Sequence, residues 1–253
     1  MTRVAVYGAA GRMGRTVIET AASRENLRIV CGIDATAPGL SVPSYAAENL
    51  DAALREHQPD AVIDFSVPDA SVSLAETCAN FGVALVIGTT GFSKRQLASL
   101  ETASEAVPLL KATNFSRGIQ ALLRALGSAV ESLDGYDIEV VETHHNQKQD
   151  APSGTANTIL ETLAEYREFE TVSGREGIQP REENEIGMLV RRAGGIRGEH
   201  EVLLAGNDEV LTLTHRAEDR AVFAAGALDS AVWVAGRDAG WYEFGDVVGR
   251  QTE

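Results

Sequence analysis

Two adjacent histidines and a lysine stand just before a Ser-Gly-Thr sequence in the stretch HHNQKQDAPSGTA. His144 and His145 can carry protons near neutral pH, and Lys148 adds a full positive charge. Ser153 opens the Ser-Gly-Thr run, where a helix is predicted to begin and to present free backbone N–H groups to an anion. These residue types in this order favour a pocket that binds an anion and gives it a proton.

Three simpler interpretations of the same stretch compete with this one. A histidine pair can bind zinc, but no cysteine or third histidine follows at a ligand spacing, so we predict no metal. The histidines could instead be solvated loop residues, and the Ser-Gly-Thr a helix cap and nothing more. Adjacent histidines on a strand would face opposite ways. We expect His144 and Lys148 to lie on a loop, where neither contributes much to the core.

A glycine-rich turn follows the first predicted strand, in the sequence VAVYGAAGRMG. Gly8, Gly11 and Gly14 lie between that strand and a predicted helix, which is the arrangement that lets a backbone approach a pyrophosphate. Asp34 ends the second predicted strand about 20 residues later, where a carboxylate meets an adenosine ribose hydroxyl. Alone, the glycines would fit a plain tight turn. Together with Asp34 at the expected distance along the chain, they predict nucleotide binding.

Two further loops should lie at the same edge of the sheet. Gly88, Thr89 and Thr90 close a predicted strand at 83–91, and the segment KATNFS follows the next strand. Ligands of open parallel sheets bind beyond the carboxyl ends of the strands, so both loops should line the crevice that begins at Gly8. The alternative for each is a loop without a ligand.

The pattern of elements changes part-way along the chain. Strand-like runs at 3–8, 27–34, 61–66, 83–91 and 107–116 alternate with helical runs at 11–23, 50–57, 70–81 and 93–106. This alternation predicts a parallel sheet covered on both faces. Beyond it come a helix at 118–133, a strand at 136–145 and a helix at 155–167. Three short alternating strands then predict an open antiparallel sheet, and the chain turns helical again from Ala221.

The composition limits the classes of function. Of the 253 residues 44% are hydrophobic, and the net charge is −15, so this is a globular chain whose surface repels nucleic acid and anionic membranes. No run approaches the roughly 18 apolar residues that a membrane helix needs. Cys31 and Cys78 are expected to be buried free thiols, which favours the cytoplasm. Acid excess with few lysines is typical of salt-loving organisms, and a GC-rich genome gives a similar composition.

The whole chain resembles the 4-hydroxy-tetrahydrodipicolinate reductase (dihydrodipicolinate reductase) family. The motifs that carry the resemblance are GAAGRMG, DFS, GTTG, NFS, E-x-HH-x-x-K-x-DAPSGTA, RAG-x-I-x-GEH and the closing helix through SAVW, in the family's order. The HH-x-x-K-x-DAPSGTA stretch is highly specific, whereas the glycine turn is not.

The resemblance implies a fold and a set of site residues. The fold would be a Rossmann-like doubly wound parallel sheet (1–114 and 221–253) with a smaller α+β substrate domain (115–220), whose open, mostly antiparallel sheet builds a homotetramer. NADH or NADPH would be bound by Gly8, Ala9, Ala10, Gly11, Arg12, Met13, Asp34, Gly88, Thr89, Thr90, Ala112, Thr113, Asn114 and Phe115. His144 and Lys148 would be catalytic, and His145, Gly154 and Thr155 would hold the carboxylates of a small cyclic dicarboxylate. The two domains would close on each other to exclude water.

The chain departs from the family's pattern at two places. Gly195 stands where many members have aspartate; this segment is expected to lie on the sheet, so the departure puts no catalytic role in doubt. Ala35 stands where some members carry an arginine that meets a 2′-phosphate, which puts the choice between NADH and NADPH in doubt. Two other functions stay open: another dehydrogenase of this fold acting on a small amino-dicarboxylate, and a dinucleotide sensor without catalysis. A semialdehyde dehydrogenase is disfavoured because Cys31 and Cys78 are poorly placed for a nucleophile.

Overall fold

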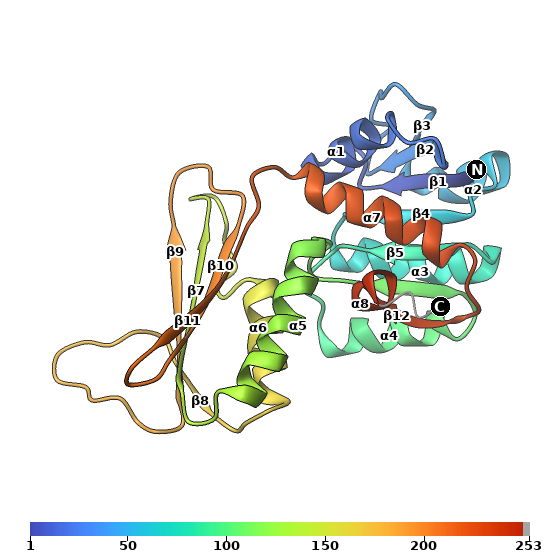
Figure 1. Cartoon of the computed structure of the whole chain (residues 1–253). Coiled ribbons are helices and arrows are strands. Elements are labelled where there is room, and N and C mark those ends of the chain that lie inside the picture. The colour runs from blue at the N-terminus through green and yellow to red at the C-terminus, as the bar shows by residue number, and fades with distance from the viewer. Residues whose placement is uncertain (250–253) are drawn as a thin grey trace. The chain divides into compact units, whose positions relative to one another are not determined.

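The chain folds as two compact units in a computed structural model that describes residues 1–249 (Figure 1). Unit 1 contains residues 1–116 and the chain from Arg220 onward, and unit 2 contains Arg117–Asp219. The end of the chain therefore returns to the unit in which it began. None of the helices within the described residues combines the length and the apolarity needed to cross a membrane.

Unit 1 is built on a seven-stranded parallel sheet in the order β12-β6-β5-β4-β1-β2-β3. Its strands are β1 (Thr2–Tyr7), β2 (Leu27–Asp34), β3 (Ser44–Ala46), β4 (Ala61–Asp64), β5 (Ala84–Ile87), β6 (Pro108–Lys111) and β12 (Gly240–Glu243). Its helices are α1 (Arg12–Ala21), the 3-10 turn η1 (Ala47–Asn49), α2 (Leu50–His57), α3 (Pro68–Phe81), α4 (Lys94–Ser104), α7 (Ala221–Val234) and α8 (Phe244–Val248).

The helices cover both faces of this sheet, because alternate strand residues point to opposite sides. Val4 and Val6 of β1 pack in the core under α1, α7 and α8, whereas Ala5 and Tyr7 pack in the core under α2, α3 and α4. The doubly wound parallel sheet predicted from the sequence is therefore confirmed. The short edge strands β3 and β12 were not predicted.

Unit 2 holds a five-stranded sheet in the order β11-β10-β7-β9-β8. Its elements are α5 (Arg117–Ser132), β7 (Asp137–His144), α6 (Gly154–Ala164), β8 (Glu170–Val172), β9 (Glu185–Arg192), β10 (Glu199–Ala205) and β11 (Val210–Arg216). β10 runs antiparallel to β7 and β11, while β9 runs parallel to β7 and β8.

The second sheet is thus mixed, and the expectation of a mostly antiparallel sheet holds for only two of its four pairings. The physical reason is that α6 forms a crossover between β7 and the strands that follow, and such a crossover returns the chain in a parallel direction. The sequence shows three strands without a helix between them from residue 185 onward. It does not show that β9 and β10 join opposite sides of β7.

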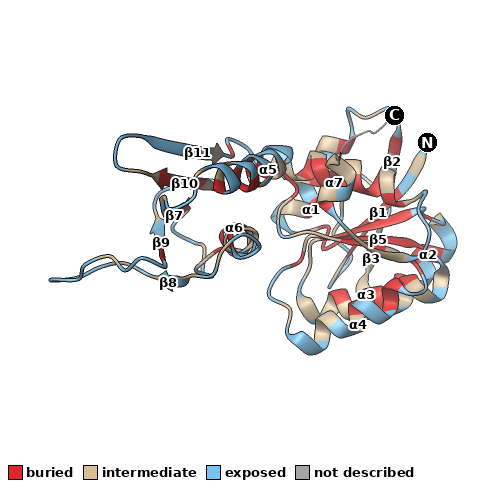
Figure 2. Cartoon of the chain, turned by 60° about the horizontal axis from the view of Figure 1, so that its bottom comes forward, coloured by how far each residue is buried: buried red, intermediate tan, exposed pale blue. Residues whose placement is uncertain are grey.

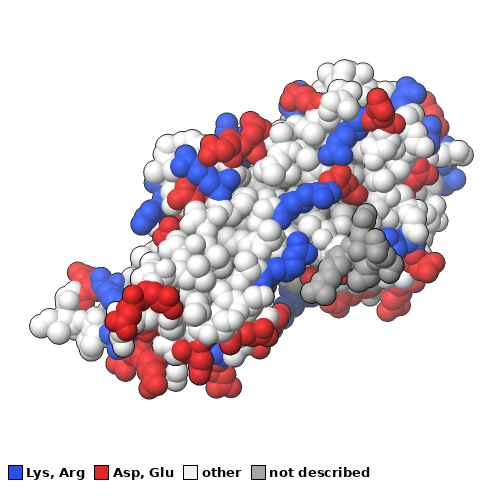
Figure 3. Space-filling model, in the orientation of Figure 1, with Lys and Arg blue, Asp and Glu red and all other residues white. Residues whose placement is uncertain are grey.

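Helices α5 and α6 cover the core of unit 2, which includes Ile138, Val140, Ile159 and Leu204. The sheet also leaves large apolar residues more than a third exposed. These residues are Leu189, Val190, Val210 and Leu211. Figure 2 shows β11 coloured largely as exposed. On the face drawn in Figure 3, acidic side chains gather along the lower edge, in keeping with the net charge of −15.

Candidate active site

The predicted cofactor residues all lie in unit 1, at the edge where the parallel strands end. Each group follows a different strand: Gly8–Met13 follow β1, Asp34 ends β2, Gly88–Thr90 follow β5 and Ala112–Phe115 follow β6. These strands lie within one continuous run of the sheet. The fold therefore brings the four segments to the edge where open parallel sheets bind their ligands.

The turn after β1 has room for a backbone but not for side chains. Gly8 has a φ of 75°, and a Cβ atom there would lie 2.5 Å from the carbonyl oxygen of Phe65. A Cβ at Gly14 would lie 2.3 Å from the carbonyl oxygen of Gly8. No side chain caps α1 at Gly11, so the start of the helix is open to an anion. These features fit the pyrophosphate of a dinucleotide.

Asp34 is hydrogen-bonded to the same turn. Its Oδ2 accepts a hydrogen bond from the backbone N–H of Ala10 at 2.8 Å, and its Oδ1 accepts one from the N–H of Ala35 at 2.8 Å. The carboxylate that the sequence assigns to a ribose thus also fixes the phosphate-side backbone. Substituting Asp34 would disturb both functions.

A buried carboxylate that the sequence analysis missed lies at the centre of this edge. Asp64 ends β4 and is fully buried. It accepts hydrogen bonds from Ser66 N at 2.9 Å and Thr89 Oγ1 at 3.0 Å, and another from the Ser71 hydroxyl. Burial raises its pKa, and these hydrogen bonds oppose that rise. Because the Thr89 hydroxyl is hydrogen-bonded to Asp64, we expect Thr89 to contribute to a cofactor site through its backbone and not through its side chain.

Phe115 is also directed into the core. Its ring packs edge-on against Phe65 at 5.9 Å and against Phe244 at 5.4 Å between centroids, and only 2% of the residue is exposed. A Cβ at Gly226 would overlap the Phe115 carbonyl. The contribution of Phe115 to a cofactor site is therefore to fix the backbone of 112–115.

The predicted substrate residues all lie in unit 2, around the end of β7 and the start of α6. Along β7 the inward face carries Ile138, Val140, Glu142 and His144 in strict alternation. The first two belong to the core under α5 and α6. Glu142 and His144 occupy the next two inward positions, so a carboxylate and an imidazole stand where the alternation would otherwise place apolar core residues.

His144 is the last residue of β7 and only 8% exposed, so the expectation that it lies on a loop is wrong. Its Nδ1 lies 3.1 Å from Oε2 of Glu142. Its ring packs edge-on against His200, with 5.2 Å between centroids. The polar run HHNQK suggested a loop from residue 144 onward, but backbone pairing with Arg192 extends the strand through His144.

Glu142 is fully buried and has partners from three other elements. Its Oε1 accepts hydrogen bonds from Nη2 of Arg192 at 2.9 Å and from the backbone N–H of Ser153 at 3.1 Å. Burial alone would raise its pKa, but the neighbouring His144 and the hydrogen bonds from Ser153 and Arg192 outweigh burial and lower the pKa to about 2. Glu142 is therefore a carboxylate across the whole physiological pH range.

A third histidine, which the spacing argument missed, completes the cluster. His200 is the cross-strand partner of Glu142 in the β7–β10 pairing, and its Nε2 lies 3.1 Å from Oγ of Ser153. Burial and then the neighbouring His144 lower its pKa to about 3, so the ring is neutral. Glu142, His144 and His200 lie close enough to share a cation. Because Arg192 already pairs with the carboxylate, we assign no metal to them.

The remaining predicted residues surround this cluster. Ser153 caps α6, with its Oγ accepting from the N–H of Ala156 at 3.2 Å, so Gly154 and Thr155 form the first turn. His145 follows β7 and is half-buried. Lys148 Nζ donates to both carboxylate oxygens of Asp150 at 2.8 Å. The arrangement can hold an anion at the helix start beside a shielded imidazole.

Comparison with known families decides which group of proteins this is. The model of the C-terminal part of dihydrodipicolinate reductase matches residues 118–248, and the model of its N-terminal part matches residues 2–115. The chain belongs to the dihydrodipicolinate reductase family. It is an oxidoreductase of that family, and the resemblance inferred from its motifs is confirmed.

Individual relatives align with nearly the whole chain. The chain is 58% identical over 248 residues to the 4-hydroxy-tetrahydrodipicolinate reductase of Haloarcula marismortui, covering 98% of this chain and 99% of the relative. It is 52% identical to the reductase of the same name from Natronomonas pharaonis, covering 97% and 99%. A dipicolinate-bound dihydrodipicolinate reductase from Paenisporosarcina sp. TG-14 superposes with a TM-score of 0.78 at 25% identity, covering 96% and 97%.

In unit 2, the residues that sequence reasoning missed are Glu142, Arg192 and His200. The signals were present in the motifs E-x-HH and RAG-x-I-x-GEH. The segment that begins at Arg192 was expected on the sheet, and Arg192 there contacts Glu142 directly. Gly198, from the same motif, allows close approach, because a Cβ there would lie 3.1 Å from Nε2 of His144.

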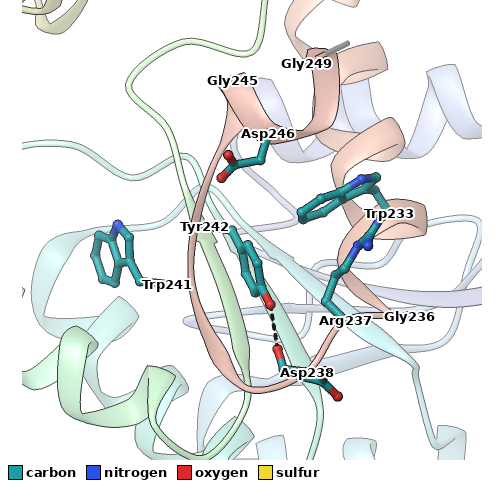
Figure 4. A pocket seen from close by; sticks show the side chains of 9 residues that line it. All are labelled: Trp233, Gly236, Arg237, Asp238, Trp241, Tyr242, Gly245, Asp246 and Gly249. Carbon is teal, nitrogen blue, oxygen red and sulfur yellow. Dashed lines mark hydrogen bonds between the residues drawn. The ribbon is translucent and has the colours of Figure 1, made fainter. Parts of the chain in front are cut away.

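A surface cavity of about 690 Å³ lies elsewhere in unit 1, beside α7, β12 and α8 (Figure 4). Arg237 stacks over the Trp233 ring at 4.1 Å, and Tyr242 donates a hydrogen bond to the Asp238 carbonyl at 3.0 Å. The cavity contains none of the predicted cofactor or substrate residues. Because it contains none of them, we assign it no part in the chemistry of this reductase family.

Proposed function

We propose that this enzyme reduces 4-hydroxy-tetrahydrodipicolinate to tetrahydrodipicolinate with NADH or NADPH, in lysine and diaminopimelate biosynthesis. The observation that carries the proposal is the buried His144 paired with Glu142 beside the first turn of α6. Relatives that match almost the whole chain bear the name of this reductase. A dinucleotide sensor would have no use for such an imidazole.

The substrate is a cyclic dicarboxylate, and an acidic protein must attract it locally. Lys148, His145 and the first turn of α6 at Gly154 and Thr155 supply positive charge and N–H donors for the two carboxylates. His144 is then the group that exchanges a proton with the ring.

Each unit contributes a different part of the reaction. The 4-hydroxyl leaves as water together with a proton from the adjacent ring carbon, and the reduced nicotinamide, when bound in unit 1, would supply a hydride to the carbon that carried the hydroxyl. His144 gives a proton to the adjacent ring carbon and regains one from solvent. Lys148 is the second proton donor, and its positive charge faces a substrate carboxylate.

A coupled assay tests the proposal. The upstream synthase generates the substrate in place, and nicotinamide absorbance follows its reduction. We expect oxidation of the cofactor that depends on the synthase. Pyridine-2,6-dicarboxylate should also raise the melting temperature of the protein, because it presents two carboxylates on a planar ring. A protein that oxidises no cofactor and ignores this compound would instead be a nucleotide sensor.

Cofactor choice follows from Asp34 and its neighbour. The Asp34 carboxylate repels a 2′-phosphate, and Ala35 supplies no compensating cation, although Arg12 can reach a phosphate from the start of α1. We therefore expect NADH to be used at least as well as NADPH, with both accepted. Steady-state kinetics with each cofactor measure this. A kcat/KM for NADPH more than about tenfold above that for NADH, about 1.4 kcal/mol in the wrong direction, would contradict it.

We propose further that the enzyme is a cytoplasmic homotetramer. Leu189, Val210 and Leu211 are large apolar residues of the mixed sheet that are more than a third exposed, and exposed apolar surface on a sheet is often covered by a partner. The buried free thiols Cys31 and Cys78 are at home in a reducing compartment. Light scattering on the purified enzyme gives the mass in solution, and a monomer would contradict the assembly.

A further inference from the structure

One carboxylate is held by side chains or backbone from three elements besides its own strand. Glu142 lies on β7, Arg192 ends β9, His200 lies on β10, and Ser153 caps α6. Arg192 also donates to the carbonyl oxygen of Asp150 at 2.6 Å. It thereby ties Glu142 to the loop that carries Lys148. A group fixed from so many sides has little freedom to turn.

The two oxygens of Glu142 have different tasks. Oε1 accepts from Arg192 and from the Ser153 backbone. Oε2 faces Nδ1 of His144 at 3.1 Å and Nε2 of His200 at 3.8 Å. Neither Glu142 Oε2 nor His144 Nδ1 makes a hydrogen bond of normal geometry, although both atoms are buried. A buried acceptor and donor at this separation form a bond that a small rotation of the imidazole completes.

We propose that Glu142 is a positioning residue for His144. It keeps the single proton of the neutral imidazole on Nδ1, and so leaves Nε2 as the atom that exchanges a proton with the substrate. The proposal rests on the function proposed above and deepens it. The step balances: the doubly protonated imidazole gives its Nε2 proton to the ring carbon, and the Nδ1–H that remains faces the carboxylate.

The charged and titratable groups around His144 support this arrangement. Arg192 keeps Glu142 ionised without touching the imidazole. The neutral His200 from β10 adds no charge, and His215 on β11 and Lys148 act on His200 from farther away. Glu142 is thus the negative group that faces the imidazole within the described residues. Gly198 leaves space beside Nε2, the atom that must meet the substrate.

The first test uses the wild-type protein and needs no activity. Imidazole ¹⁵N chemical shifts distinguish a proton on Nδ1 from one on Nε2, and His144→Gln assigns the signal among the five histidines. We expect neutral His144 to carry its proton on Nδ1. A proton on Nε2 would overturn the proposal. Because this readout does not involve turnover, an enzyme inactive toward the substrate would refute the proposed function and leave this test intact.

The second test is Glu142→Gln, which keeps the shape and removes the charge. We expect kcat to fall about 10²-fold, at the lower end of the loss typical for a missing proton donor, with little change in KM for the cofactor. The descending limb of the kcat–pH profile should also move to lower pH. Oε2 of Glu142 is the negative charge that faces the proton donor, so its removal should move this limb.

Matched variants separate positioning from a structural role. Glu201→Gln makes the same change next to His200 on a side chain of the opposite face of β10, and should leave kcat and the limb unchanged. Glu142→Asp retains the charge, and should restore the limb even where kcat stays low. A lower kcat for Glu142→Gln with an unmoved limb would show a structural role and overturn the proposal. If Glu142→Gln does not fold, the pH profile of Glu142→Asp and the tautomer of His144 in the wild-type protein test the proposal instead.

Discussion

Replacing His144 with alanine should lower kcat by about 10² to 10⁴, the range in which a positioned proton donor contributes. Cofactor binding should stay near normal, because every predicted cofactor residue lies in unit 1 while His144 lies in unit 2. Steady-state kinetics with saturating cofactor and a fluorescence titration of NADH measure the two quantities separately. A folded variant that retains more than about a tenth of the wild-type kcat would remove His144 from its role.

The same variant should also be less stable than a loop substitution would be. His144 is 8% exposed and packs against His200, so its loss leaves a space and exposes the Glu142 carboxylate to an unfilled side. We expect about 1–3 kcal/mol of destabilisation, and not the sub-kcal/mol change expected for a residue on a loop. His144→Gln fills more of the space and serves as the control. Equal kcat losses with unequal melting temperatures would separate chemistry from stability.

Most of the fold of unit 1 could be predicted from local sequence patterns. Each β-branched run and each amphipathic run is long enough to be identified, and their alternation selects a parallel sheet. Local chemistry even placed helix ends. Ser93 and Gln96 form the reciprocal cap of α4, at the residue where the predicted helical run 93–106 begins. The glycines after β1 were informative because close backbone contact at Gly8 and Gly14 excludes any side chain.

The site in unit 2 could be predicted only in part, because pairing between strands distant in sequence creates it. His200 meets Glu142 through the register of β7 and β10, and Arg192 meets it through the parallel pairing of β7 with β9. A one-residue change in either register would turn these side chains to the other face. No local spacing encodes that register. The histidine pair could therefore be identified from the sequence, whereas the contact between Glu142 and His144 could not.

Lys148→Ala should impair both turnover and substrate binding. Lys148 lies on the loop between β7 and α6, and its Nζ is held by Asp150 at 2.8 Å. The Asp150 side chain is 58% exposed, so this ion pair is weakened by solvent and a substrate carboxylate can replace it. We expect kcat to fall about 10²-fold and the substrate KM to rise about tenfold, the effect of about 1.4 kcal/mol.

Two matched variants identify which part of the lysine matters. Lys148→Arg keeps a positive charge but does not release its proton near neutral pH, so it should restore much of the substrate KM and little of kcat. Asp150→Asn removes the competing carboxylate, and should leave the substrate KM unchanged or lower it. The free energy of unfolding, measured by thermal melts, should fall by no more than about 1 kcal/mol, because the ion pair lost by Lys148→Ala is with an exposed carboxylate. If Lys148→Ala raised KM alone, the lysine would bind the substrate without donating a proton. His144 would then be the single proton donor on this loop and strand.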